Sequence, residues 1–217
     1  ADVLTEVGFN NLNQQLSQLE ISLKKGRAQV DAYTRMPRQQ RSAQELDQAI
    51  LAMFAAWESC RELLRDVAVA SDSSSTSLNN YISQILFLSD LRDQAGRVAS
   101  SIMAHVTFEA PLPTENITRS LQTQHQVRYL WALIDTIQPV QDKTEEFIRL
   151  HRRVETEFIQ QGLPIVSELI SDSLEQRDYR LSGTELTEAI VDKFATVVDL
   201  QTYLLQYSRD AAIQEMN

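Results

Sequence analysis

Glycine, proline and cysteine are scarce in this sequence. Five glycines and five prolines in 217 residues leave few places where the chain can turn, so its structural elements must be long. The single cysteine, Cys60, excludes an internal disulfide but leaves the redox compartment undecided. Because Cys60 lies on an apolar helix face, we interpret it as a small buried hydrophobic residue.

Catalytic motifs are also missing. The sequence contains no Gly-x-x-x-x-Gly-Lys loop, no Gly-x-Ser-x-Gly elbow and no Cys-x-x-Cys pair. None of its three histidines, His105, His125 and His151, follows a glutamate by three residues, as the Glu-x-x-His pairs of a di-iron bundle do. We therefore predict no catalytic residues, no metal site and no cofactor, in a protein that is not an enzyme.

The charge balance and the hydropathy exclude further classes of function. The sequence has 20 basic and 30 acidic residues, a net charge of −10, which repels nucleic acid and anionic lipid. No apolar run approaches the ~18 to 20 residues that a membrane span requires. The chain opens at Ala1 without an N-terminal signal, which fits a processed product or a domain excised from between membrane segments.

The residues that are present favour helices. Apolar side chains recur at spacings of three and four, and no alternating strand pattern occurs. Residues 42–45 and 182–185 have the Ser-x-x-Glu pattern of capping boxes, and Pro37 should end the first helix. We expect six or seven helical segments, at about 2–35, 42–67, 78–108, 114–137, 147–158, 164–179 and 182 to near the C-terminus.

The sequence thus predicts an all-α fold. Helices of ~30 residues are about 45 Å long and pack best as an elongated, antiparallel, up-and-down bundle. We treat residues 1–217 as one domain, either a single kinked bundle or two stacked four-helix modules that share long helices. Breaks are expected near 71–77, 109–113 and 162–164. In the fourth segment, the inward face should include Leu121 and Trp131.

Several arginines lie on or beside the apolar stripe of a helix, and these are the candidate binding residues. Such a side chain can simply cover core atoms with its stem while its guanidinium stays in water. Alternatively, two guanidinium groups can converge on a carboxylate and bind it with both oxygens. Nearby tryptophans would then wall a pocket, although ordinary core packing also explains them. The candidate residues are Trp57, Arg61, Arg92, Gly96, Arg97, Arg128 and Trp131.

Two stretches carry a resemblance to a known group of proteins. Residues 89–97 read Ser-Asp-Leu-Arg-Asp-Gln-Ala-Gly-Arg, and residues 181–190 read Leu-Ser-Gly-Thr-Glu-Leu-Thr-Glu-Ala-Ile. Both resemble the all-helical extracytoplasmic sensor domains of bacterial transmembrane receptors, namely chemoreceptors, sensor histidine kinases and membrane-bound diguanylate cyclases. Some of these domains are single four-helix bundles and others are helical bimodular domains.

The resemblance implies a periplasmic domain of an inner-membrane receptor, with a membrane helix before its first helix and another after its last. It also implies a homodimer, and a small ligand such as an organic acid or amino acid. Arg92 and Arg97 are the positions to which the resemblance assigns a ligand-binding or structural role. Our hypothesis is that Arg92 and Arg128 pair with a ligand carboxylate, and that binding shifts the population of helix packings. The alternative is a helical interaction or scaffold bundle without a small ligand.

Overall fold

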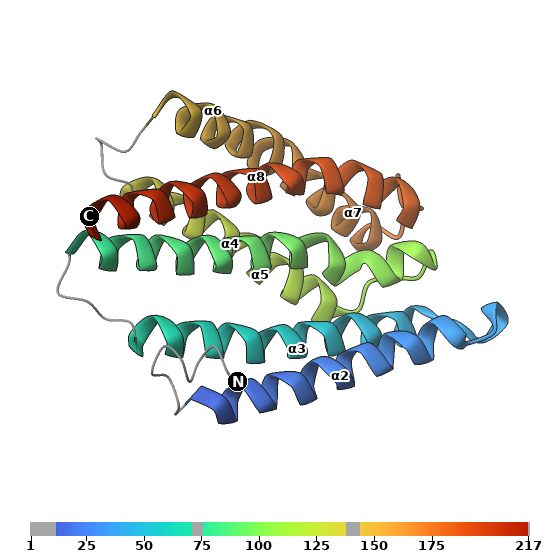
Figure 1. Ribbon diagram of the computed structural model, residues 1–217. Helices are drawn as coiled ribbons and strands as arrows, with labels where there is room; N and C mark the ends of the chain where they lie inside the picture. The colour runs from blue at the N-terminus through green and yellow to red at the C-terminus, as the bar shows by residue number, and fades with distance from the viewer. Residues whose placement is uncertain (1–11, 71–75, 138–143, 217) are drawn as a thin grey trace. The chain divides into compact units, whose positions relative to one another are not determined.

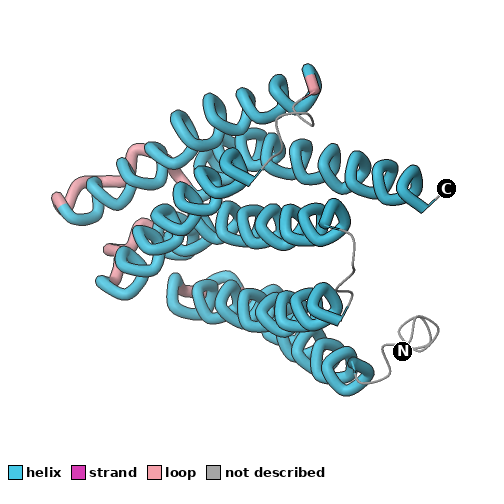
Figure 2. Tube along the Cα trace, turned by 90° about the vertical axis from the view of Figure 1, so that its left-hand side faces the viewer, coloured by secondary structure: helices cyan, strands magenta, loops and turns pink. Residues whose placement is uncertain are grey.

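The computed structural model describes residues 12–70, 76–137 and 144–216, and every regular element within these ranges is a helix (Figures 1 and 2). The helices pack against one another through their apolar faces, which confirms the predicted all-α bundle. The chain divides into two compact units, Ala1–Asn79 and Asn80–Asn217.

The first unit is a helical hairpin of α2 (Asn13–Arg35) and α3 (Ala43–Ala70), joined through the short 3-10 turn η2 (Arg38–Gln40). Helix α2 ends two residues before Pro37, as predicted. A Cβ atom added at Gly26 would lie 3.1 Å from the Ala52 carbonyl oxygen, so this glycine permits close approach of the two helices. The predicted helix start at Asp2 lies outside the described residues.

Two local predictions for α3 have different outcomes. The capping box forms, because the backbone N–H of Glu45 donates to the Ser42 hydroxyl at 3.4 Å and the two side chains also bond to each other. Cys60, expected to be buried, is only half-buried. Even this partial burial raises the pKa of its thiol by desolvation.

The second unit is an up-and-down four-helix bundle. Its helices follow one another as α4 (Thr76–Thr107, entering from the end of the first unit), α5 (Thr114–Ile137), a long composite helix and α8 (Gly183–Met216). The composite helix joins α6 (Glu145–Arg153), the π-helix η4 (Val154–Gly162) and α7 (Leu163–Leu174). In Figure 1, α8 (red) runs beside α4 (green). All four helices contribute to one core, whose fully buried side chains include Leu91, Phe147, Phe158 and Leu200.

The predicted helix break at Gly162 and Pro164 is wrong. The backbone stays helical through this region, and Gly162 itself has right-handed helical dihedrals. A proline inside an α-helix clashes with the carbonyl four residues earlier. Here the turn before Pro164 is widened: the N–H of Leu163 bonds to the Phe158 carbonyl, five residues back, as in a π-helix. Pro139, whose ring would either kink a helix or begin a new one, lies outside the described residues.

One residue of the predicted inner face of α5 is placed differently, whereas Trp131 is buried as predicted. Leu121, predicted to face inward, is 50% exposed, whereas Asn116 and Ser120 are buried. Both polar side chains donate to backbone carbonyls of α4, from Asn116 Nδ2 to Ser101 at 3.0 Å and from Ser120 Oγ to Val98 at 3.3 Å. Small hydrogen-bonded side chains therefore occupy the inner face of this part of α5.

Candidate functional site

A cavity of about 820 Å³ opens at one end of the second unit, where two helix connections meet. Its lining comes from the α4–α5 turn, the end of α7, the α7–α8 loop and the starts of α5 and α8. The lining residues are 109–112, Ile117, 173–174, 176–182 and Glu185. The cavity has the size of a small-molecule site.

The α4–α5 and α7–α8 connections begin with the same backbone motif. Helix α4 closes with a hydrogen bond from Ala110 N–H to the His105 carbonyl, and α7 closes with one from Arg177 N–H to the Asp172 carbonyl, each 2.9 Å long. These five-residue steps are the closing bonds of Schellman motifs. The residues at the turning points, Glu109 and Gln176, have positive φ angles of 50° and 55°, which glycine normally supplies.

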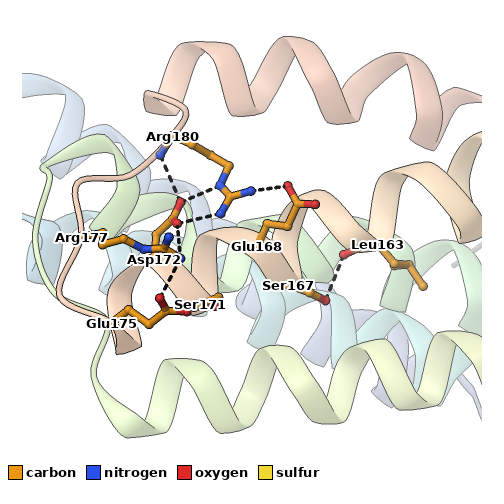
Figure 3. A network of polar contacts seen from close by, with 8 residues as sticks. All are labelled: Leu163, Ser167, Glu168, Ser171, Asp172, Glu175, Arg177 and Arg180. Carbon is orange, nitrogen blue, oxygen red and sulfur yellow. Dashed lines mark hydrogen bonds and ion pairs between the residues drawn. The ribbon is translucent and has the colours of Figure 1, made fainter.

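A buried carboxylate holds the α7–α8 loop in place (Figure 3). Asp172, 3% exposed, accepts from Arg180 Nε at 2.9 Å and from Arg180 Nη2 at 2.8 Å, and also from the Arg180 backbone N–H at 3.2 Å. These hydrogen bonds to the Arg180 guanidinium, and its charge, lower the pKa of Asp172 to about 2. The same contacts raise the pKa of Arg180, so both groups are charged at neutral pH.

The two arginines of the loop both pair with acidic residues. Arg180 Nη1 also donates to Glu168 at 2.8 Å. Arg177 Nη2 lies 3.4 Å from Asp172 Oδ1 and 3.0 Å from Glu175 Oε2. Two guanidinium groups therefore converge on one carboxylate, the arrangement sought in the sequence, but the carboxylate belongs to the protein.

Two further hydrogen bonds join the α4–α5 turn to the α7–α8 side of the cavity. The Tyr179 hydroxyl donates to the Ala110 carbonyl at 2.7 Å, and the Leu112 N–H donates to the Ser173 hydroxyl at 2.8 Å. Burial raises the pKa of Tyr179 above its ordinary value, so the hydroxyl remains a donor at neutral pH. A molecule in the cavity would thus contact both connections at once.

The candidate residues predicted from the sequence do not gather around this cavity. Trp57 and Arg61 lie on α3 in the first unit, and the other five lie in the second unit. Trp57 is half-buried, with no acceptor for its indole N–H among the described residues, and Arg61 pairs with Glu58 at 3.2 Å.

Three of the candidates lie on α4, and the two arginines among them have partners within the protein. Arg92 is exposed and its Nη1 donates to Gln201 Oε1 on α8 at 3.3 Å. Arg97 pairs with Asp93 one turn earlier, at 2.9 Å. A Cβ atom at Gly96 would meet the Phe194 ring at 3.7 Å, an ordinary contact distance.

On α5, Arg128 is exposed and Trp131 packs in the core. The Trp131 indole, 7% exposed, stacks on His151 with ring centroids 4.3 Å apart, and its N–H donates to Glu155 on the π-helix at 2.5 Å. None of the seven candidates lines the cavity. The residues missed were Arg177 and Arg180, and a signal for them was present: the charged stretch 177–180, Arg-Asp-Tyr-Arg, between a helix and a capping box.

A second hollow, of about 460 Å³, lies along the outer surface of α6 and η4. Two of its arginines bind neighbouring acids: Arg149 bonds to Glu146, and Arg153 bonds to Glu157 and Asp199. Within the described ranges, no group of three or more His, Cys, Asp or Glu side chains is placed to hold a metal ion. No described helix combines the length and the apolar character needed to cross a membrane.

Comparisons with known proteins give no assignment. No family model, no curated protein and no solved structure matches this chain. The resemblance to sensor domains therefore stays a hypothesis based on residues 89–97 and 181–190.

Proposed function

We propose that this chain is a sensor domain of a bacterial transmembrane receptor, in which a small molecule binds in the cavity at the end of the second unit. The observation that supports it most is the position of this cavity, between the connection that follows α4 and the connection that precedes α8. Among the described residues, these are the two longest helices, with 32 and 34 residues. A ligand bound between the end of α4 and the start of α8 can therefore change how these two helices pack.

The seam between α4 and α8 suits such a response. Gln201 on α8, buried in the seam, accepts from Arg92 and donates to Ser89 at 3.4 Å, both on α4. Nearer the cavity, Thr187 contacts the Met103 sulfur at 3.8 Å. Polar and flexible contacts of this kind can exchange partners when one helix slides, and the proposal requires that two such packings differ little in free energy. A ligand that prefers one packing then shifts the population toward it.

The setting of this domain follows from the resemblance alone. In the proposal, the domain is periplasmic, its first and last helices continue into membrane helices, and it acts as a homodimer. The ligand changes the register of α8 against α4, and α8 carries that change away from the cavity.

A ligand screen with a matched pair of variants tests the proposal. Thermal unfolding is followed against organic acids, amino acids and amines, since a ligand at 100 times its Kd stabilises the fold by about 2.7 kcal/mol. Ile117→Trp fills the cavity and should abolish any ligand-induced shift. Leu121→Trp, one turn later on the exposed side of the same helix, should preserve it. No shift with any compound, or an equal shift in both variants, would contradict binding in this cavity.

The alternative, a scaffold bundle, is favoured by one observation. Leu121 and Tyr129 on α5 are 50% and 63% exposed, and a spacing of eight residues places them on similar sides of the helix. If a partner protein binds this face of α5, changing both residues to serine should abolish that binding. Ligand binding in the cavity should be unaffected.

A further inference from the structure

The charges around the cavity that have no partner are negative. Glu109, at the turning point after α4, and Asp178, in the α7–α8 loop, are both exposed and line the cavity. Neither carboxylate has a hydrogen bond or ion pair to any described residue. The two positive groups of the lining, Arg177 and Arg180, are bound to acids as described above.

The electrostatic balance therefore disfavours an anion here. The network of Arg177 and Arg180 with Asp172, Glu168 and Glu175 contains two positive and three negative groups. An anionic ligand would have to share Arg177 with Asp172 and Glu175, and would lie near the unpaired carboxylates of Glu109 and Asp178. A cation meets two carboxylates that have no competing partner, and the net charge of −10 attracts it from a distance.

The rest of the lining suits an apolar body attached to that cation. Leu112, Ile117 and Leu181 supply aliphatic surface, and Tyr179 supplies a half-buried aromatic ring. An aromatic ring attracts an ammonium group through its π face, in addition to any contact with a carboxylate. Apolar walls with a few polar groups are typical of small-molecule sites.

We propose that the ligand of this cavity is a small organic cation, an amine carried on an apolar or aromatic body and held between Glu109 and Asp178. This inference rests on the proposed function, since it assigns a ligand class to the same cavity. It differs from the organic acid that the resemblance to sensor domains implies, because both arginines of the lining already pair with acids and the carboxylates without a partner are negative.

Two probes of nearly equal shape and opposite charge decide the ligand class. 2-Phenylethylamine and 3-phenylpropionate are titrated separately into the ¹⁵N-labelled chain at low salt. We expect the amine to shift backbone amide signals of residues 109–112 and 176–182, with an affinity that falls as salt is added. The carboxylate should leave these signals unchanged.

Substitutions of the two carboxylates then test whether Glu109 and Asp178 bind the amine. Glu109→Gln and Asp178→Asn should each weaken amine binding about threefold, and the double variant about tenfold, a range typical of exposed charge pairs. Glu188→Gln, an exposed position on α8 outside the lining, is the control and should leave affinity unchanged. Equal affinity in the double variant and in this control would overturn the assignment of the two carboxylates.

The possible failures are distinguishable. Binding of the carboxylate but not the amine would overturn the inferred ligand class and leave the cavity as the sensor site. Binding of neither probe would overturn the inferred class as well. If the wider screen were also silent, the proposed function would fail with it.

Discussion

Asp172 links the stability of the α7–α8 loop to pH. Its pKa is lowered from 3.8 to about 2 in the folded protein by the hydrogen bonds and charge of Arg180. A carboxyl group with a lowered folded-state pKa contributes stability that is fully present above its unfolded pKa. This contribution should disappear as the pH falls from about 4 toward 2.

Replacing Asp172 tests this linkage. We expect Asp172→Asn to lower the free energy of unfolding at pH 7 by about 2 kcal/mol, less than a fully buried pair because Arg180 is half-exposed. The measurement is urea unfolding of both proteins at pH 7, 4 and 2.5, and the gap between them should narrow at the lowest pH. Glu175→Gln, an exposed member of the same network, should cost less than about 0.5 kcal/mol at pH 7. A gap that is constant with pH would contradict the role assigned to the Asp172 charge.

Glu109 and Gln176 occupy positions where glycine would be more stable. Both have positive φ, which costs a residue with a Cβ atom about 1 kcal/mol. Glu109→Gly and Gln176→Gly should therefore each raise the free energy of unfolding by about 0.5 to 1 kcal/mol, measured by urea unfolding. Gln122→Gly, at an exposed interior position of α5, should lower it by about 1 kcal/mol. Destabilisation by all three changes would show that the two turning points are not strained.

Helix ends set by local sequence were predictable, and those that depend on packing were not. Helices α3 and α8 begin at capping boxes, where the Ser182 and Glu185 side chains bond to each other and to the opposite backbone N–H. The π-helix was missed because Gly162 and Pro164 suggest a break when read locally. The core pattern did not reveal it either, because the buried residues Ile159 and Leu163 keep the four-residue spacing of an α-helix; the π-helix shows only in the hydrogen bond from the Leu163 N–H to the Phe158 carbonyl, five residues back.

A one-residue deletion tests whether the π-helix is a one-residue insertion into an α-helix. Removing the exposed Gln160 restores a four-residue spacing between Phe158 and Leu163, so the segment can become α-helical with its core contacts kept. The deletion is made in a Pro164→Ala background, because the ring would clash in a regular α-helix. We expect it to change the free energy of unfolding by less than about 1 kcal/mol in urea.

The control for this experiment is a deletion in a regular α-helix. Removing the exposed Thr202 from α8 moves Leu204 and Ser208 off their buried face, and loss of a buried leucine alone costs about 3 kcal/mol. If the Gln160 deletion were as costly as the Thr202 deletion, the π-helix would not be a one-residue insertion.

The all-α fold was predictable from the hydrophobic periodicity of the sequence, whereas the cavity was not. A seam of apolar residues on each long helix is enough to specify an all-α bundle. Which side chains meet at its end depends on loops whose backbone no local pattern fixes. The apolar stripes of the sequence predict arginine pairs on helix faces. There, Arg92 and Arg97 have intramolecular partners, and the converging pair lies in the loop at Arg177 and Arg180.

The proposed signal through the second unit can be blocked without altering the cavity. Met103 and Thr187 face each other across the α4–α8 seam, with 3.8 Å between sulfur and hydroxyl oxygen, and neither lines the cavity. The double variant Met103→Cys/Thr187→Cys, made in a Cys60→Ser background, places two thiols there whose disulfide would prevent one helix from sliding along the other. Binding of 2-phenylethylamine should persist in both redox forms.

The reduced and oxidised forms should differ in which amide signals shift when the ligand binds. In the reduced form, we expect amide signals to shift near the cavity and along the seam as far as Ser89 and Gln201. In the oxidised form, the shifts should stop near the cavity, because a packing change that requires sliding is no longer accessible. Seam shifts of equal size in both forms would mean that ligand binding does not act through the α4–α8 register, and a cavity without this coupling would bind a small molecule but not signal by helix displacement.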